Sequence, residues 1–252
     1  TVTITATLSI KVDEAVTVAL STSGAATEGT DYGTISDITV SAGATTGTAT
    51  FDPTDDSVYE DDEAATIAID SVSGGGASES GSQSVAVTIT ENESEPTVTL
   101  ATSATSIAEN AGSSLTLTAT LSGATDQNVT VVLGTSGTST EGTDYTDGSG
   151  NIDDITITAG STTGTVSFTP TDDSIYEGNE TAIIAISSVT GEASESGTQA
   201  VTITITDNES APTVTLTTSA TSIAENAGSS LTLTATLSGA TNADVTVALS
   251  TS

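Results

Sequence analysis

Almost identical blocks recur at a fixed distance along the sequence. Residues 96–125 read PTVTLATSATSIAENAGSSLTLTATLSGAT, and residues 212–241 repeat this run with Thr217 in place of Ala101. The two blocks begin 116 residues apart. A fixed period makes each repeat one structural unit, and a unit of this length can close a hydrophobic core of its own. The chain is therefore expected to consist of domains in tandem.

Shorter motifs divide the whole chain in the same frame. They are TATLS at 5–9, 118–122 and 234–238, TEGTDY at 27–32 and 140–145, and PTDDS-x-YE at 53–60 and 170–177. In this frame, residues 1–94 form a repeat that lacks its first strand, residues 95–210 form a complete repeat, and residues 211–252 open a third. Because the frame starts and stops inside repeats, we expect the sequence to be part of a longer repetitive protein.

Short runs in which apolar residues alternate with Thr fill the complete repeat. LTLTATL and VTITIT have the period of two that is typical of strands with one buried face, and clusters such as ENAGSS separate the runs. We expect seven strands, at 97–101, 115–121, 129–133, 152–158, 164–169, 181–187 and 201–206. Seven short strands in about 110 residues predict an all-β, immunoglobulin-like two-sheet sandwich. Tyr145, Phe168 and Tyr176 are expected to fill its core, because large rings dominate core burial.

The charge of the chain excludes several kinds of partner. Lys11 is the one basic residue against 34 acidic ones, which gives a net charge of −33. Nucleic-acid binding needs Lys and Arg against phosphate, and anionic membrane surfaces repel such a chain. No apolar run approaches the ~20 residues of a membrane span. We expect no nucleic-acid partner and no direct membrane insertion of this segment.

The absence of two residue types narrows the possible chemistry. The chain has no Cys and no His, so zinc, copper and iron–sulfur sites are not expected. Without His, the many Ser and Thr hydroxyls lack the usual base that activates a nucleophile. We therefore expect a protein that is not an enzyme.

Acidic residues gather in the loops and at the strand ends of each repeat. If these loops converge at one end of a sandwich, carboxylates about 4 Å apart repel by roughly 4 kcal/mol at an effective dielectric of 20. No Lys or Arg lies in either cluster. A hard divalent cation would offset the repulsion, and Ca²⁺ takes 6–8 oxygen ligands in flexible geometry. The alternative is a solvated acidic surface that keeps a long polymer soluble.

Four motifs of the complete repeat resemble, in order, those of the Calx-beta domain: SIAENAG, TEGTDY, PTDDSIYEGNET and VTITITDNE. Members of that family include regulatory calcium-binding domains of sodium–calcium exchangers and long arrays in bacterial surface adhesins. The resemblance implies a seven-stranded sandwich that holds Ca²⁺ at one end, near the junction with the next domain. Carried over motif by motif, it implies the calcium ligands Glu109, Asp144, Asp172, Asp173, Glu177, Glu180 and Asp207, and in the first repeat Asp31, Asp55, Asp56, Glu60, Glu63 and Glu91.

The arrangement of the repeats favours a mechanical role. The link from one repeat to the next is short, and Pro212 stiffens it by fixing φ. We expect a structural extender, a stalk segment of a bacterial cell-surface adhesin or extracellular filament, stiffened by calcium near the junctions between repeats. Its partners would be neighbouring repeats of the same chain and other copies in a filament. A calcium-sensing regulatory module and a carbohydrate- or surface-binding module, which would use the rows of Thr, are the alternatives.

Overall fold

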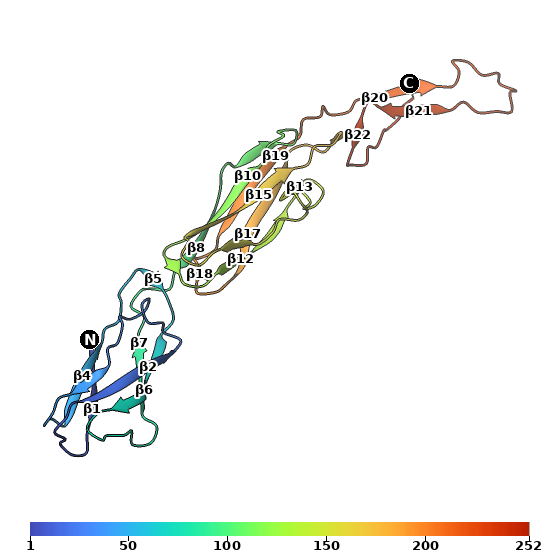
Figure 1. Ribbon diagram of the computed structural model, residues 1–252. Coiled ribbons are helices and arrows are strands. Elements are labelled where there is room, and N and C mark those ends of the chain that lie inside the picture. The colour runs from blue at the N-terminus through green and yellow to red at the C-terminus, as the bar shows by residue number, and fades with distance from the viewer. Residues whose placement is uncertain (252) are drawn as a thin grey trace. The chain divides into compact units, whose positions relative to one another are not determined.

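The computed structural model describes residues 1–251, which form strands and connecting loops and no helix (Figure 1). Accordingly, this described part of the chain contains no helix long and apolar enough to span a membrane. The chain divides into two compact units. The first comprises Thr1–Pro96 with Gly123–Gln127, and the second comprises Thr97–Ser122 with Asn128–Ser252.

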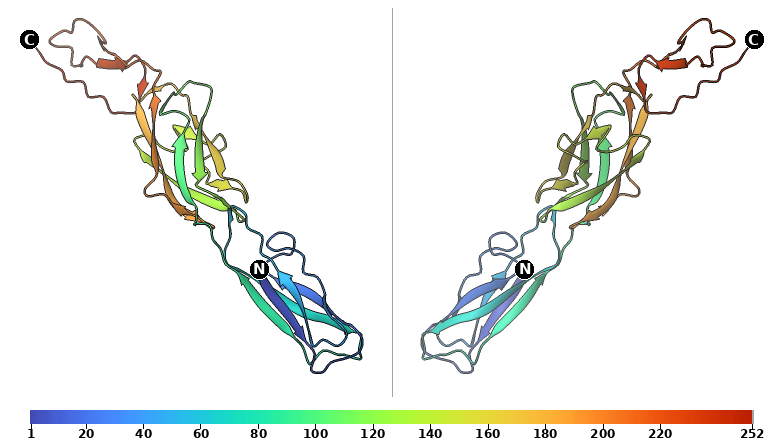
Figure 2. Two further views of the ribbon diagram at one scale, coloured as in Figure 1. Left: turned by 90° about the vertical axis from the view of Figure 1, so that its left-hand side faces the viewer. Right: turned by 90° about the vertical axis from the view of Figure 1, so that its right-hand side faces the viewer.

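The second unit contains a sandwich of two five-stranded sheets. In both figures its long strands run side by side and its loops gather at the strand ends (Figure 1, Figure 2). One sheet has the order β13 (Tyr145–Thr146), β15 (Thr163–Pro170), β10 (Leu115–Leu121), β8 (Thr97–Thr102) and β18 (Ser194–Glu195). The other has the order β14 (Ile155–Ile157), β12 (Val129–Gly137), β17 (Glu180–Thr190), β19 (Ala200–Thr206) and β9 (Ser106–Ala108). The predicted all-β sandwich is confirmed.

Alternation of side chains along the strands builds the core of this unit. In β10, Leu117, Ala119 and Leu121 are buried, and Thr residues separate them. Side chains of a strand point alternately to opposite faces, so one face packs inward and the other carries Thr. Phe168 and Tyr145 are almost fully buried and stack with their ring centroids 4.7 Å apart. Their rings lie among the aliphatic side chains of both sheets.

All seven predicted strands of the complete repeat are present, and one is shorter than expected. Strand β14 begins at Ile155, whereas the pattern predicted a start at Ile152. The amide of Ile152 donates to Oε1 of Glu141 at 2.6 Å, so a side chain takes the place of a strand partner. Tyr176 is only half-buried and lies in the two-residue strand β16 (Ile175–Tyr176), so its predicted place in the core is wrong. Strand β16 pairs with β22 (Ala240–Thr241) in a two-stranded sheet of its own, at the edge of the sandwich and outside both five-stranded sheets.

The first unit repeats this plan with fewer strands. Strand β1 (Val2–Thr7) pairs with β4 (Thr46–Phe51), and a four-stranded sheet has the order β3 (Ile38–Val40), β2 (Val16–Gly24), β6 (Glu63–Ser73) and β7 (Ser84–Ile89). Within the described residues, no strand takes the places that β8 and β9 hold in the second unit. Tyr32 and Phe51 stack at 4.6 Å, as their counterparts do in the second unit.

The last segment of the described chain forms a small antiparallel pair. Strand β20 (Val214–Thr218) pairs with β21 (Leu233–Leu237), and every residue of both strands is exposed. Leu216 and Leu233 are 53% and 55% exposed, whereas Leu117 in the matching strand β10 is fully buried. The same sequence is therefore buried only where the opposite sheet covers it.

One glycine of the second unit is required by geometry, and replacing it should destabilise that unit. Gly137 has a φ of +124°, and a Cβ atom built there would lie 2.1 Å from the carbonyl oxygen of Thr181. We expect Gly137→Ala to cost about 1–3 kcal/mol of unfolding free energy, because both the backbone angle and the collision oppose it. Urea denaturation measures this cost. Gly197→Ala is the matched control, since Gly197 has a φ of +68° but open space around it. Equal losses in the two variants would mean that the collision contributes nothing.

Candidate metal centre

A turn in the second unit holds the carboxylate of Asp144 in place. The amide of Thr140 donates to Oδ2 of Asp144, and the amide of Asp144 donates to the carbonyl of Thr140 at 2.9 Å. The Asp144 carbonyl accepts from the amide of Thr171 at 2.9 Å. Thr171 belongs to the acidic loop, which we define as residues 170–180. The TEGTDY motif therefore presents one fixed carboxylate beside this loop.

The end of the last strand fastens the acidic loop from the other side. Oδ2 of Asp207 accepts from the amides of Glu177 and Gly178, at 2.8 and 2.5 Å. Oδ1 of Asp207 accepts from the amide of Glu209 at 2.7 Å. Burial alone would raise the pKa of Asp207, but these backbone donors outweigh it and lower the pKa. Asp207 therefore stays ionised and connects the loop to strand β19.

Glu109 reaches the same place from strand β9. It is 6% exposed, and its Oε1 accepts from the amide of Asp173 at 3.0 Å. Its own amide donates to the carbonyl of Thr206 at 3.0 Å, which continues the parallel pairing of β9 with β19. The SIAENAG motif is thus brought against the last strand by pairing between segments about 100 residues apart in sequence.

These contacts assemble two groups of carboxylates at one end of the second unit. Asp144, Glu177 and Glu180 each offer an oxygen within 4.8 Å of the others. Glu109, Asp207 and Glu209 form a second group by the same criterion. Each group combines side chains from different parts of the chain, so neither exists before the sandwich folds.

Crowding of negative charge perturbs the acids of both groups. Burial, then the charge of Asp144, raises the pKa of Glu180 to about 7. Burial, followed by the charges of Asp144, Asp173 and Asp207, raises the pKa of Glu177. Burial also raises the pKa of Glu109, with smaller contributions from neighbouring carboxylates. Proteins relieve such repulsion by protonation or by a bound cation.

The first unit reproduces the first of these groups. Asp31, Glu60 and Glu63 each offer an oxygen within 4.8 Å of the others. The amide of Thr27 donates to Oδ2 of Asp31, as the amide of Thr140 does to Asp144 in the second unit. Burial, then the charges of Asp31 and Asp56, raises the pKa of Glu60 to about 7.

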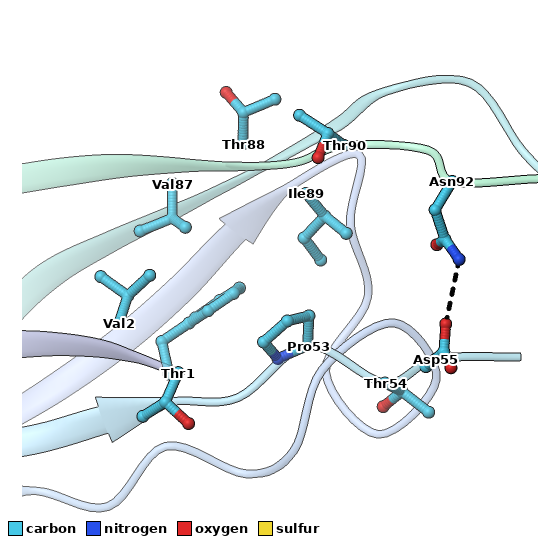
Figure 3. Close-up of a pocket in the computed structure, with 11 residues that line it drawn as sticks. Thr1, Val2, Pro53, Thr54, Asp55, Val87, Thr88, Ile89, Thr90 and Asn92 are labelled. Carbon is cyan, nitrogen blue, oxygen red and sulfur yellow. Dashed lines mark hydrogen bonds between the residues drawn. The ribbon is translucent and has the colours of Figure 1, made fainter.

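Glu91 takes the place of Asp207 in the first unit. Its Oε2 accepts from the amide of Glu60 at 2.6 Å, and its Oε1 accepts from the amide of Glu93, also at 2.6 Å. Beside it, Nδ2 of Asn92 donates to Oδ1 of Asp55 at 3.2 Å, at the edge of a hollow lined by Val2, Pro53 and Ile89 (Figure 3). In the second unit, β9 carries Glu109 into this region, and the first unit has no described counterpart of that strand.

The structure brings eight of the thirteen predicted ligands into these groups and leaves the other five outside them. The carboxylates of Asp173 and Asp56 accept from the amides of Ile175 and Val58, two residues further along the chain. The carboxylate of Glu91 accepts hydrogen bonds from backbone amides, and the carboxylate of Asp55 accepts one from Nδ2 of Asn92. Asp172 is exposed. As calcium ligands, all thirteen remain predictions. Glu209 belongs to one of the groups although it was not among the predicted ligands. Its position two residues after Asp207 is the sequence feature that could have indicated this.

The donor set suits a hard cation. Every side chain in the groups is a carboxylate, so only oxygen ligands are offered. Oε2 of Glu209 is buried and has no hydrogen-bond partner, which leaves one oxygen free to bind an ion. Carboxylate oxygens in a loop-built site are the ligands that Ca²⁺ prefers. The acidic clusters of this chain can therefore hold calcium ions.

Fold and site together define tandem β-sandwich modules with carboxylate clusters at the loop end. The family model of the Calx-beta domain matches residues 1–93 and 91–209. The chain belongs to the Calx-beta domain family, which confirms the resemblance drawn from its motifs.

Solved structures of Calx domains are similar to the chain. The apo form of the Calx CBD1 domain shares 17% identity and covers 44% of this chain and 98% of its own, with a TM-score of 0.37. CBD12 from CALX1.2 shares 16% identity over 81% of this chain and 92% of its own, with a TM-score of 0.34. The calcium binding domain CBD12 of CALX1.1 shares 16% identity over 75% and 74%, with a TM-score of 0.32. No curated protein sequence matches the chain.

The raised pKa values predict that the metal-free chain becomes less stable as the pH rises towards 7. Glu60 and Glu180 have a pKa of about 7 in the folded chain against 4.5 as the ordinary value. Between these values the folded state holds more protons than the unfolded state, so unfolding free energy falls with rising pH. The lowered pKa of Asp207 acts in the opposite direction, but only below its ordinary value of 3.8.

Thermal midpoints in excess chelator, measured from about pH 4.5 to about pH 7.5, test this expectation. We expect the midpoint to decline over that window. The double variant Glu60→Gln and Glu180→Gln should flatten the decline, because neither side chain then ionises. A midpoint that rises over the same window in the unmodified chain would contradict the assignment.

Proposed function

We propose that this chain is a stalk segment of a long repetitive bacterial cell-surface adhesin or extracellular filament, in which Ca²⁺ stiffens the joints between repeats. The observation that carries the proposal is the recurrence of one carboxylate group at the same place in successive repeats. Asp31, Glu60 and Glu63 in the first unit correspond to Asp144, Glu177 and Glu180 in the second. A site that is copied with the repeat suits a repeated mechanical task.

The position of the groups supports a role at the joint. Glu209 lies in the second unit three residues before Pro212, and Asp207 connects the acidic loop to the end of β19. An ion held there would fix the point at which the chain leaves the sandwich. Without it, repulsion among the carboxylates would loosen the acidic loop. The chain also has no His that could activate a nucleophile, which favours a role other than catalysis.

The net charge supports an extended, exposed protein. A charge of −33 keeps a long chain soluble. The absence of Cys leaves folding independent of disulfides, so calcium, which is abundant outside cells, would supply the stabilisation. Neighbouring repeats and other copies of the chain are the proposed partners.

Distance distributions between spin labels test the proposal. The chain has no Cys, so Ser41→Cys in the first unit and Ser113→Cys in the second give two unique attachment points, both exposed. We expect the distribution to narrow in millimolar calcium and to stay broad in chelator or magnesium. Calorimetric titration of the same chain reports binding directly. Absence of calcium binding, or an equally broad distribution with calcium bound, would overturn the proposed mechanism.

A further inference from the structure

A short segment that the sequence frame assigns to the complete repeat lies in the first compact unit. Strand β11 (Ala124–Thr125) pairs in parallel with β5 (Val58–Tyr59). The amide of Asp126 then donates to the carbonyl of Tyr59 at 3.2 Å. Since Glu60 directly follows Tyr59, this pairing brings Asp126 beside the group of Asp31, Glu60 and Glu63.

The second unit contains the same arrangement one period later. Strand β22 pairs in parallel with β16, and the amide of Asn242 donates to the carbonyl of Tyr176 at 3.3 Å. Asn242 lies 116 residues after Asp126 in the sequence. The pairing of this loop with the segment around Tyr59 or Tyr176 is therefore a property of the repeat. The residue that follows the paired segment differs, because it is Asp126 in the first case and Asn242 in the second.

The carboxylate of Asp126 is held in place with one oxygen left over. Its Oδ2 accepts from Nε2 of Gln127 at 2.9 Å. Its Oδ1 is buried and has no hydrogen-bond partner. Thr125, which is 1% exposed, donates through Oγ1 to the carbonyl of Gln127 at 2.8 Å and closes the loop. A buried carboxylate oxygen without a partner costs free energy unless something binds it.

The surroundings of that oxygen are negative. The charge of Asp126 contributes to the raised pKa of Glu60 and of Glu63, so the three carboxylates lie within electrostatic reach of one another. Repulsion alone would push the loop of Asp126 away from the acidic loop. A cation bound between the carboxylate of Asp126 and those of the acidic loop would replace this repulsion with attraction.

We propose that Asp126 is a calcium ligand of the Asp31, Glu60 and Glu63 group, supplied by the repeat that follows in the sequence. The ion would then join β5 to β11 and fasten the next repeat's loop to the acidic loop. In the second unit, Asn242 stands at the corresponding place, and its side chain donates a hydrogen bond to Glu177, which opposes the rise in the pKa of that carboxyl. At this position the two sites differ by one negative charge, and Asp126 strengthens calcium binding at the first unit's group. This inference rests on the proposed function.

Exchange of the two residues tests the proposal in the full chain. Asp126→Asn should weaken calcium binding at the first unit's group about tenfold, because a charged ligand becomes a neutral one. Asn242→Asp should strengthen calcium binding at the second unit's group by a similar factor. Calorimetric titration measures both, and hydrogen exchange at the amide of Asp126 reports whether calcium fastens β11. Asp13→Asn, which removes the same charge from an exposed loop before β2, is the control and should change neither affinity.

The outcomes separate the inference from the function on which it rests. If the unmodified chain binds no calcium, both fail. If it binds calcium and neither Asp126→Asn nor Asn242→Asp changes the affinities, the role of Asp126 is overturned while the calcium-stiffened stalk stands. A single cooperative thermal transition of each variant in chelator establishes that folding is intact.

Discussion

In millimolar calcium, the chain is expected to unfold about 10 °C or more above its midpoint in excess chelator. An ion that binds only the folded state stabilises it by RT ln(1 + [L]/Kd), which is about 4 kcal/mol at a thousandfold excess over Kd. The groups around Glu180 and Glu60 do not exist in the unfolded chain, because their members come from separate segments. For domains of about 100 residues, each kcal/mol shifts the midpoint by roughly 4–8 °C.

Magnesium is the control for this experiment. Mg²⁺ demands near-octahedral geometry and keeps its waters, so a flexible carboxylate group should favour calcium over it. The variant Asp144→Asn with Asp31→Asn removes the carboxylate that each TEGTDY motif contributes to these groups, and it should reduce the calcium-dependent shift. Midpoints that coincide in calcium, magnesium and chelator would leave the carboxylates as a solvated acidic surface and the stalk as a passive spacer.

Phe168→Ala is expected to lower the unfolding free energy of the second unit by about 3–5 kcal/mol. The ring is 0% exposed and stacks on Tyr145 at 4.7 Å. Its removal loses the burial of a large apolar side chain and leaves a cavity that the surrounding strands fill only in part. Urea denaturation in chelator measures the loss, with hydrogen exchange by mass spectrometry to follow each unit separately.

Two matched variants control this measurement. Phe51→Ala removes the equivalent ring from the first unit, and it should shift that unit's transition while leaving the second unit's unchanged. Leu233→Ala removes a side chain that is 55% exposed and should change the unfolding free energy by no more than about 0.5 kcal/mol. A Phe168→Ala loss as small as that of Leu233→Ala would mean that the stacked pair is not central to the core.

Local patterns predict the strands well because their physical cause is local. The alternation in LTLTATL specifies one apolar and one polar face, and β10 buries Leu117 and Ala119 as expected. The same pattern says nothing of what covers the apolar face. Leu233 belongs to an identical run and is exposed, because no opposite sheet packs on it in the described chain.

Aromatic side chains show the same division. Tyr145 and Phe168 were predicted for the core and are buried there, whereas Tyr176 lies half-buried at the edge in β16. Residue type alone did not separate these rings. The parallel pairing of β16 with β22 places Tyr176 at the edge, and that pairing joins segments about 65 residues apart in the sequence.

The sequence by itself determined the tandem frame, the all-β class and the supply of carboxylates, since each follows from composition and short-range pattern. Only the tertiary structure decided which carboxylates meet. Asp172 and Asp173 are both exposed and join no group, whereas Glu177 and Glu180 of the same acidic loop meet Asp144. Asp126 reaches Glu60 only through the pairing of β11 with β5. Distances between side chains from remote segments depend on strand pairing and packing, and these are settled when the chain folds as a whole.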